Sequence, residues 1–160
     1  IPITISDRLM EGGSFEIGNL IGLIGQFRSY NKIADGKSKL VLRVFVRELC
    51  ECDDNAPNVI EIEGYVCKQP VYRTTPFKRE IADLLIAVNR AYNKSDYIPA
   101  IAWGRNARYA SMFRVGEKIH LVGRIQSRIY QKALDDGSVE ERVAYEVSIT
   151  KFEQEKEIEN

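Results

Sequence analysis

Two stretches of this chain repeat one pattern at a constant spacing of 98 residues. FEIGNLIGLIGQFRS (15–29) aligns with FRVGEKIHLVGRIQS (113–127). The aligned identities are Phe15/Phe113, Gly18/Gly116, Ile21/Ile119, Leu23/Leu121, Gly25/Gly123 and Ser29/Ser127. Chance agreement of this length with matched glycines is improbable, so the sequence predicts two copies of one structural module. We expect the first copy to be incomplete, because no residues of this sequence stand before it as 58–92 stand before the second.

Period-two patterns predict strands in both copies. Apolar residues recur at every second position in KIHLVGRIQSRIY (118–130) and ERVAYEVSITKF (141–152). KLVLRVFV (39–46) and VIEIEGYV (59–66) are β-branched runs of strand length. The turn signals between these runs are Asp35-Gly36, Asp53-Asp54-Asn55 with Pro57, and Asp135-Asp136-Gly137. The sequence therefore predicts a fold made mainly of strands.

Residues 79–92 fit two structures. Ile81, Leu84, Leu85 and Val88 have helical spacing, yet LLIAV within the same segment is a buried strand of normal length. Periodicity alone does not decide between them. A short helix is predicted over residues 106–112, with Gly104 at its entry.

Composition bounds the class of protein. The chain has 160 residues, with 44% hydrophobic and 29% charged residues. No apolar run is long enough for a membrane span and no signal peptide is visible, so we expect a cytoplasmic protein. The three cysteines, Cys50, Cys52 and Cys67, argue against a disulfide framework. With a C-x-C pair and one distant histidine, His120, they are a poor set of zinc ligands.

The charges are unevenly distributed along the chain. Residues 65–132 carry 13 Lys and Arg against 4 Asp and Glu, a local net charge of +9. The remainder carries 10 basic and 19 acidic residues, so the whole is neutral. A basic stretch of this kind attracts phosphates, although short chains also segregate surface charge by chance.

Residues 58–153 resemble bacterial single-stranded DNA-binding proteins across the length of their oligonucleotide-binding (OB) domain. The matching pieces follow in the family's order: NVIEIEGYVCKQPVYRTT for the first strand and its bend, IADLLIAVNRAY for the second, YIPAIAWGRNARYASMFRVG for the third strand and a helix, KIHLVGRIQSRIYQK for the fourth, and ERVAYEVSITKFE for the last. By this resemblance the ambiguous segment is a strand.

The resemblance implies an all-β fold, a five-stranded Greek-key OB barrel with a short helix, preceded by a partial second OB-like module. Residues 1–56 would be the last three strands of a repeat, residues 57–153 the complete OB domain, and residues 154–160 a charged tail. A module that lacks two strands exposes unpaired sheet edges. A lost segment, a partner chain or disorder would have to account for those edges.

The resemblance also implies a site for unpaired bases and phosphates. Aromatic rings stacked on bases are each worth about 1 to 3 kcal/mol, and Lys and Arg neutralise phosphates. The family's stacking positions fall on Tyr92, Tyr97, Trp103 and Tyr130. The basic residues beside them in sequence, or one strand pair away, are Arg73, Arg90, Lys94, Arg105, Arg108, Arg124 and Arg128. Each arginine alone also suits a solvated surface, and a lone tryptophan often packs in a core.

The first copy is poorer in stacking groups. Ser6 stands near the place of Trp103, and RSYNK offers only Tyr30 where the second copy has SRIYQK. We therefore expect the second module to bind, and the first to serve assembly more than binding.

These features predict a protein that binds single-stranded DNA with little sequence preference, in replication, recombination or repair, without a cofactor or metal. We expect a homo-oligomer, either a dimer of two-module chains or a tetramer, and RNA stays open as a ligand. A primosome-type or other OB module that binds mainly protein is one alternative. A magnesium-dependent nuclease using Asp53, Asp54 and Glu61, or Asp135 and Asp136, is another. Solvated loops explain these carboxylates better, so we predict no enzyme.

Overall fold

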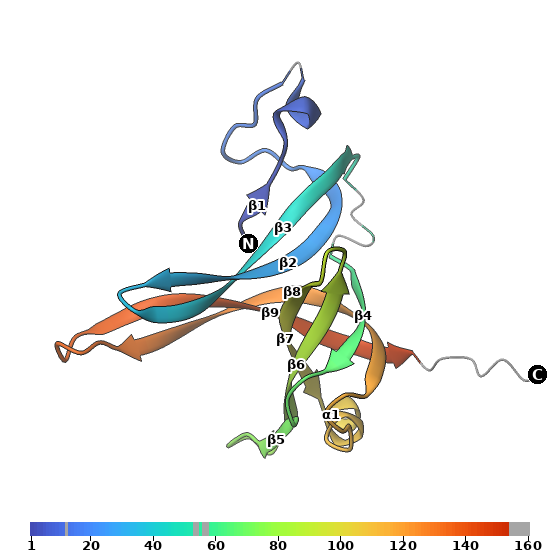
Figure 1. Cartoon of the computed structure of the whole chain (residues 1–160), viewed down its shortest axis with the longest axis vertical. Coiled ribbons are helices and arrows are strands. Elements are labelled where there is room, and N and C mark those ends of the chain that lie inside the picture. The colour runs from blue at the N-terminus through green and yellow to red at the C-terminus, as the bar shows by residue number, and fades with distance from the viewer. Residues whose placement is uncertain (12, 53–54, 56–57, 154–160) are drawn as a thin grey trace, which may run out of the picture. The chain divides into compact units, whose positions relative to one another are not determined.

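The computed structural model describes residues 1–11, 13–52, 55 and 58–153 (Figure 1). It is an all-β protein with one short α-helix, as predicted. The chain divides after Asn58 into two compact units, each described here by itself. Within the described ranges, no helix is long and apolar enough to cross a membrane. The turn expected at Asp53, Asp54 and Pro57 and the charged tail at 154–160 lie outside these ranges.

The second unit is a closed barrel. Its strands are β4 (Ile60–Val66), β5 (Val71–Thr74), β6 (Glu80–Arg90), β7 (Lys94–Trp103), β8 (Lys118–Ala133) and β9 (Val139–Glu153). They pair in the order β4-β8-β9-β7-β6-β5. A further pairing of β4 with β6, at Tyr65 with Ala87 and Val66 with Ile86, closes the sheet on itself. Closure removes the exposed edges that an open sheet would present.

Alternation along the strands fills this barrel with apolar side chains. Val66, Ile86, Leu121 and Val147 are fully buried, and Ile98 is nearly so. Each comes from a different strand, so β4, β6, β7, β8 and β9 all supply side chains to the core. Burying one such side chain stabilises the fold by about 1.5 to 3 kcal/mol. The core therefore holds the sheet whose outer positions form the candidate site.

Two details of the barrel concern its strands β4, β5 and β6. The ambiguous segment is strand β6, and its apolar run lies between β5 and β7. The first strand of the OB barrel is split into β4 and β5. Between them lies Cys67, whose backbone N–H and thiol both donate to the carbonyl of Leu85, at 3.2 and 3.3 Å. Burial raises the pKa of this thiol.

The α-helix α1 (Arg105–Ala110) begins one residue before the predicted range 106–112 and ends two residues before the end of that range. Gly104 precedes it with φ +59°, a conformation that favours glycine. Ala107 and Ala110 are fully buried. The ring of Tyr109 packs against those of Phe113 and Phe152, with centroids 5.1 and 5.4 Å away, so the helix is docked on the end of β9.

The first unit is a small sheet with one long hairpin. It contains β1 (Ile3–Thr4), the 3-10 helix η1 (Asp7–Met10), β2 (Gly22–Ala34) and β3 (Lys37–Cys50), in the sheet order β1-β3-β2. The tight turn at Asp35 and Gly36 has φ of 52° and 73°, which suits the two-residue hairpin turns with both central residues left-handed. Leu42 and Val44 are its buried apolar residues among those described.

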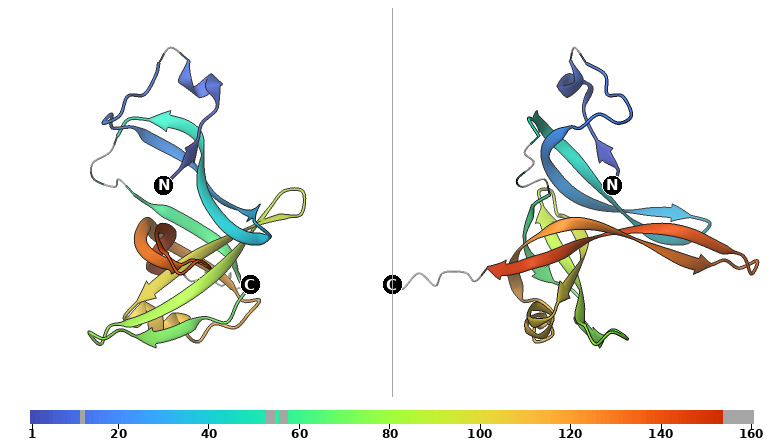
Figure 2. Two further views of the ribbon diagram at one scale, coloured as in Figure 1. Left: turned by 90° about the vertical axis from the view of Figure 1, so that its left-hand side faces the viewer. Right: turned by 180° about the vertical axis from the view of Figure 1, so that it is seen from behind.

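The two units share a strand plan. In the second, β7-β9-β8 has the same order as β1-β3-β2, and β7 runs parallel to β9 as β1 does to β3. Both hairpins change register at aligned glycines, Gly25 and Gly123, where a Cβ atom would meet a backbone oxygen of the opposite strand at 2.3 Å. Figure 2 shows the β8–β9 hairpin extending well beyond the other strands of its barrel.

Candidate nucleic-acid interface

In the second unit, one face of the sheet is defined by a row of paired residues that crosses five strands. Val71 on β5 pairs with Asp83 on β6, which pairs with Ile101 on β7. Ile101 pairs with Ser148 on β9, and Ser148 with Arg124 on β8. Residues directly paired on neighbouring strands have their side chains on the same side of the sheet, and so do residues two apart along one strand. We call this side the Trp103 face.

Three of the four predicted aromatic residues belong to this face. Trp103 and Tyr97 lie on β7 in the same phase as Ile101, about 20 Å apart along the strand. Their exposed fractions are 38% and 40%, so Trp103 is not a core residue. Tyr130 lies on β8 in the phase of Arg124 and is half-buried. The face therefore offers three partly exposed rings to a ligand that passes over it.

Tyr92 is placed differently. It lies in the turn between β6 and β7, with a φ of 64°, and its side chain is 94% exposed. Asn93 beside it also has a positive φ, 57°. Tyr92 thus stands at a hairpin tip rather than on the Trp103 face.

Two basic residues on the Trp103 face, Arg73 and Arg128, are held by carboxylates. Arg73 pairs with Ile81, the direct neighbour of Trp103 on β6, and its Nε lies 3.0 Å from Asp83 Oδ2. Arg128 Nε lies 3.5 Å from Oε2 of the buried Glu146, and its guanidinium carbon is 5.9 Å from the centre of the Tyr130 ring. These pairs fix the arginines beside the aromatic rings.

The remaining members of the predicted basic group are spread around the barrel. Arg124 is exposed on the Trp103 face. Arg105 is exposed at the start of α1, and Arg108 Nε lies 2.9 Å from Glu80 Oε2. Within the part of the chain that the structure describes, Arg105 and Arg124 form no ion pair. Within the predicted basic group, these two guanidiniums are therefore more available to a phosphate than those of Arg73, Arg90, Arg108 and Arg128, which form ion pairs.

Comparisons with known proteins agree with this geometry. A family model described as "Single-strand binding protein family" matches residues 57–154, more than half of the chain. The chain belongs to this family. It is 31% identical over 105 residues to a single-stranded DNA-binding protein of Clostridium tetani, covering 59% of this chain and 71% of that protein.

Solved structures of the same family share the fold. The chain superposes on a deletion mutant of the single-stranded DNA binding protein from Thermus aquaticus with a TM-score of 0.62 and 20% identity, covering 83% of this chain. The wild-type Thermus aquaticus protein gives a TM-score of 0.57, also at 20% identity, over 82% of this chain. The chain spans only 58% and 55% of those two proteins. This likeness shows the OB fold.

Two predicted contact residues of this family member lie away from the Trp103 face. Arg90 and Lys94 pair with each other at the ends of β6 and β7, in the opposite phase to Tyr97. Arg90 Nε lies 2.7 Å from Oδ2 of Asp96, whose side chain is only 3% exposed. A buried carboxylate needs such a partner, because an unpaired charge in a protein interior is costly. The geometry gives Arg90 a structural task at this hairpin.

Among the carboxylates considered for a nuclease, the structure describes Asp135, Asp136 and Glu61. Asp135 and Asp136 lie in the β8–β9 turn, and Asp53 and Asp54 fall outside the described residues. The Ser138 hydroxyl and backbone N–H both donate to the Asp136 carboxylate. These hydrogen bonds lower the pKa of that carboxyl, and the bond from the hydroxyl has the larger effect. Asp136 therefore serves to fix the turn.

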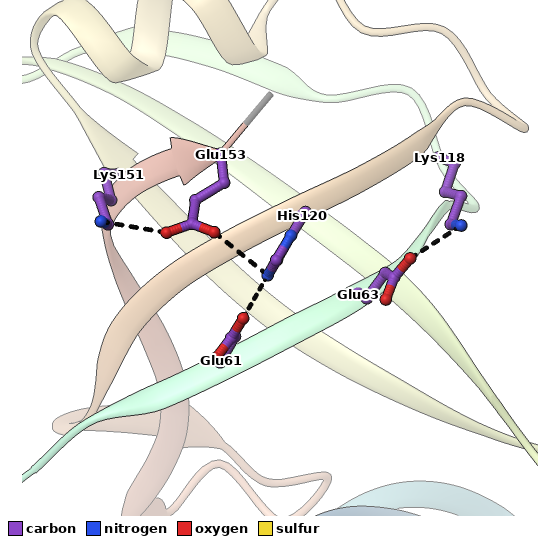
Figure 3. Close-up of polar contacts among 6 residues, drawn as sticks. All are labelled: Glu61, Glu63, Lys118, His120, Lys151 and Glu153. Carbon is purple, nitrogen blue, oxygen red and sulfur yellow. Dashed lines mark hydrogen bonds and ion pairs between the residues drawn. The ribbon is translucent and has the colours of Figure 1, made fainter. Parts of the chain in front are cut away.

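A different cluster, missed by the sequence reasoning, includes Glu61. Its Oε1 lies 2.5 Å from Nε2 of His120, and Glu153 Oε2 lies 3.6 Å from the same nitrogen (Figure 3). The three residues come from β4, β8 and β9. No sequence spacing points to this cluster, because it depends on the pairing of three strands.

Proposed function

We propose that this chain binds single-stranded DNA along the Trp103 face of its second unit, with little sequence preference and without catalysing a reaction. The observation that carries the proposal is the strand register that sets Trp103, Tyr97 and Tyr130 on one face with Arg73, Arg124 and Arg128. The family membership and the names of its relatives support the same conclusion.

Such a face can hold a flexible strand in two ways. The rings offer stacking to any base, because every base has a π-face, and each stacked base is worth about 1 to 3 kcal/mol. The guanidiniums supply charge for the phosphates and release their counterions on binding. Neither interaction reads the edge of a base, which is why we propose weak sequence preference.

Titration with oligo-dT while Trp103 fluorescence is recorded tests the proposal directly. We expect strong quenching at low salt, tight binding, and no cleavage of the oligonucleotide when magnesium is added. A second titration with RNA of the same sequence measures the preference between the two nucleic acids. An unquenched signal together with no retention of oligo-dT in a gel-shift assay would contradict the proposal and leave protein binding as the function of the module.

We infer that the first unit corresponds to the last three strands of a second OB module. The shared strand order, the parallel β1–β3 and β7–β9 pairs and the aligned glycine bulges support this inference. The homo-oligomer predicted from the sequence is part of the same proposal. Size-exclusion chromatography with light scattering measures it, and a clean monomer at micromolar concentration would count against it. The cytoplasmic location stays a prediction.

A further inference from the structure

The cluster of Glu61, His120 and Glu153 is built by strand register on the outside of the barrel. His120 pairs directly with Glu63 on β4 and with Glu153 on β9. The Glu63 carboxylate is paired with Lys118 Nζ at 2.8 Å, and this hydrogen bond is the main cause of the lowered pKa of Glu63. Glu61, two residues earlier on the same outer face of β4, reaches Nε2 of His120 in its place. Figure 3 shows the carboxylates of Glu61 and Glu153 pointing at this nitrogen.

Three metal-ligating atoms therefore converge. One ligand atom from each of the three residues can be chosen so that all lie within 4.8 Å of one another. We propose that Glu61, His120 and Glu153 form a binding site for a divalent transition-metal ion, with zinc as the best match. The proposal rests on these side chains and is independent of DNA binding.

The donor set selects the class of ion. Magnesium and calcium prefer oxygen ligands alone, whereas an imidazole nitrogen suits zinc, copper, iron and nickel. Zinc commonly takes three protein ligands from His, Asp and Glu with water in the fourth position. Metal–ligand distances of about 2.0 to 2.2 Å put the donors of a tetrahedral zinc site roughly 3.3 Å apart. Glu153 Oε2 is already near this separation from Nε2, and Glu61 Oε1 would move outward by less than about 1 Å.

Lys151 acts as a positioning residue for this site. Its Nζ lies 3.1 Å from Oε1 of Glu153, so the other oxygen of that carboxylate, Oε2, is turned toward His120. Hydrogen bonds to a ligating carboxylate commonly orient it and tune the affinity. An ion bound here would join β4, β8 and the last residue of β9. It would fasten the end of β9 to the barrel.

The test uses the whole chain freed of metal by a chelator. Cobalt(II) absorption and calorimetry with zinc report the stoichiometry and affinity, and the melting temperature with and without zinc reports the link to stability. We expect one ion per chain and a rise in melting temperature, because an ion that binds only the folded chain stabilises it. Magnesium should neither compete for the site nor raise the melting temperature.

Matched variants locate the ion. Glu61→Gln and His120→Gln should weaken zinc binding by more than about tenfold, since losing even a supporting partner costs roughly 10- to 100-fold. Glu63→Gln removes one carboxylate from the same strand and the same face and should leave affinity and the zinc-induced rise in melting temperature unchanged. Circular dichroism checks that each variant is folded.

Three results would overturn the proposal. Wild-type protein that binds no zinc at millimolar concentration would show that the cluster is an ion-pair network only. Equal affinity in wild type and Glu61→Gln would place the ion elsewhere. A loss in Glu63→Gln as large as that in Glu61→Gln would mean that general surface charge, and not this site, attracts the metal.

Discussion

The hairpins β2–β3 and β8–β9 have the same backbone plan but differ in what surrounds them. Both change register at an aligned glycine. One strand of each hairpin, β3 or β9, also pairs in parallel with a strand that precedes a short helix. In the second unit β4, β5 and β6 complete a barrel around the hairpin, whereas among the described residues of the first unit only β1 pairs with the hairpin. The buried apolar residues accordingly lie almost all in the second unit. A shared hairpin therefore does not bring a shared core.

The exposed faces differ as well. The positions aligned with Arg124, Arg128 and Tyr130 hold Gln26, Tyr30 and Lys32 in the first hairpin. One arginine on this face, Arg28, has its guanidinium carbon 5.0 Å from the centre of the Phe45 ring, and it donates a hydrogen bond to the Gln26 side chain. On this face the polar and aromatic side chains contact one another, which leaves them less available to a ligand. The same strand geometry thus serves two different surface chemistries.

The largest expected effect is on the free energy of unfolding, and it compares the cores of the two units. Leu121 is fully buried, and its aligned counterpart Leu23 is half-buried. Leu121→Ala should lower the free energy of unfolding by about 2 to 5 kcal/mol, because it leaves a cavity in a closed barrel. Leu23→Ala should cost clearly less. Urea denaturation of both variants measures the difference, and equal losses would show that the first unit holds a core as tight as the second.

The next effect concerns the stacking face. Trp103→Ala should weaken binding of oligo-dT by about 1 to 3 kcal/mol, because one stacked base loses its platform. Trp103→Phe should recover part of this loss. Ser6, which stands near the corresponding place in the first unit, provides the matched control, and Ser6→Ala should leave the affinity unchanged.

The contrary outcome for Trp103 is well defined. If the ring packed in a core, oligo-dT would not quench its fluorescence. Truncation would then reduce stability by about 3 to 5 kcal/mol instead of reducing affinity. Circular dichroism and urea denaturation of Trp103→Ala distinguish these cases.

The fold was largely predictable from the sequence because its signals are local. Alternating apolar residues, the Asp-Gly turns and the spacing of glycines predicted the strands and hairpins. Residues 79–92 show the limit of such signals. The apolar run LLIAV within this segment is compatible with a helix or with a buried strand. Only the resemblance to a family identified β6, whose neighbours β5 and β7 supply the backbone partners that make it a strand.

The candidate site was less predictable because it depends on pairing between distant strands. The sequence placed Arg90 and Lys94 among the binding residues since they are close to Tyr92 and Tyr97. Strand phase sets them on the other side of the sheet, where Arg90 neutralises the buried Asp96. The partners of Arg73 and Arg128 also come from other strands. No local pattern reports such a register.

A smaller effect is expected at Tyr130. Tyr130→Ala should cost about 1 kcal/mol of affinity for oligo-dT, the lower end of the range for stacked bases, because a phenol ring covers less of a base than an indole. Tyr30→Ala removes the exposed tyrosine of the first hairpin and should leave the affinity unchanged. Fluorescence titration of both variants tests the contrast. An equal loss in Tyr30→Ala would mean that both units bind the strand.

The smallest effect is expected in the dependence of binding on salt. For single strands, log K falls with log salt by about 0.7 for each phosphate neutralised, so five contacts would give a slope of roughly −3.5. Arg124 is exposed on the Trp103 face and forms no ion pair among the described residues, so Arg124→Gln should make the slope shallower by about 0.7. Arg73→Gln should change it less, because Asp83 already neutralises that guanidinium.

Arg90→Gln is the control for this series. It should leave the slope unchanged and reduce the free energy of unfolding, because Asp96 would lose the cation that compensates its burial. Titrations between 50 and 500 mM salt with each variant measure the slopes. If Arg90→Gln reduced the slope as much as Arg124→Gln, the phosphates would run past the β6–β7 turn rather than along the Trp103 face. A wild-type affinity indifferent to salt would remove the arginines from binding altogether, leaving stacking on Trp103, Tyr97 and Tyr130 to hold the strand.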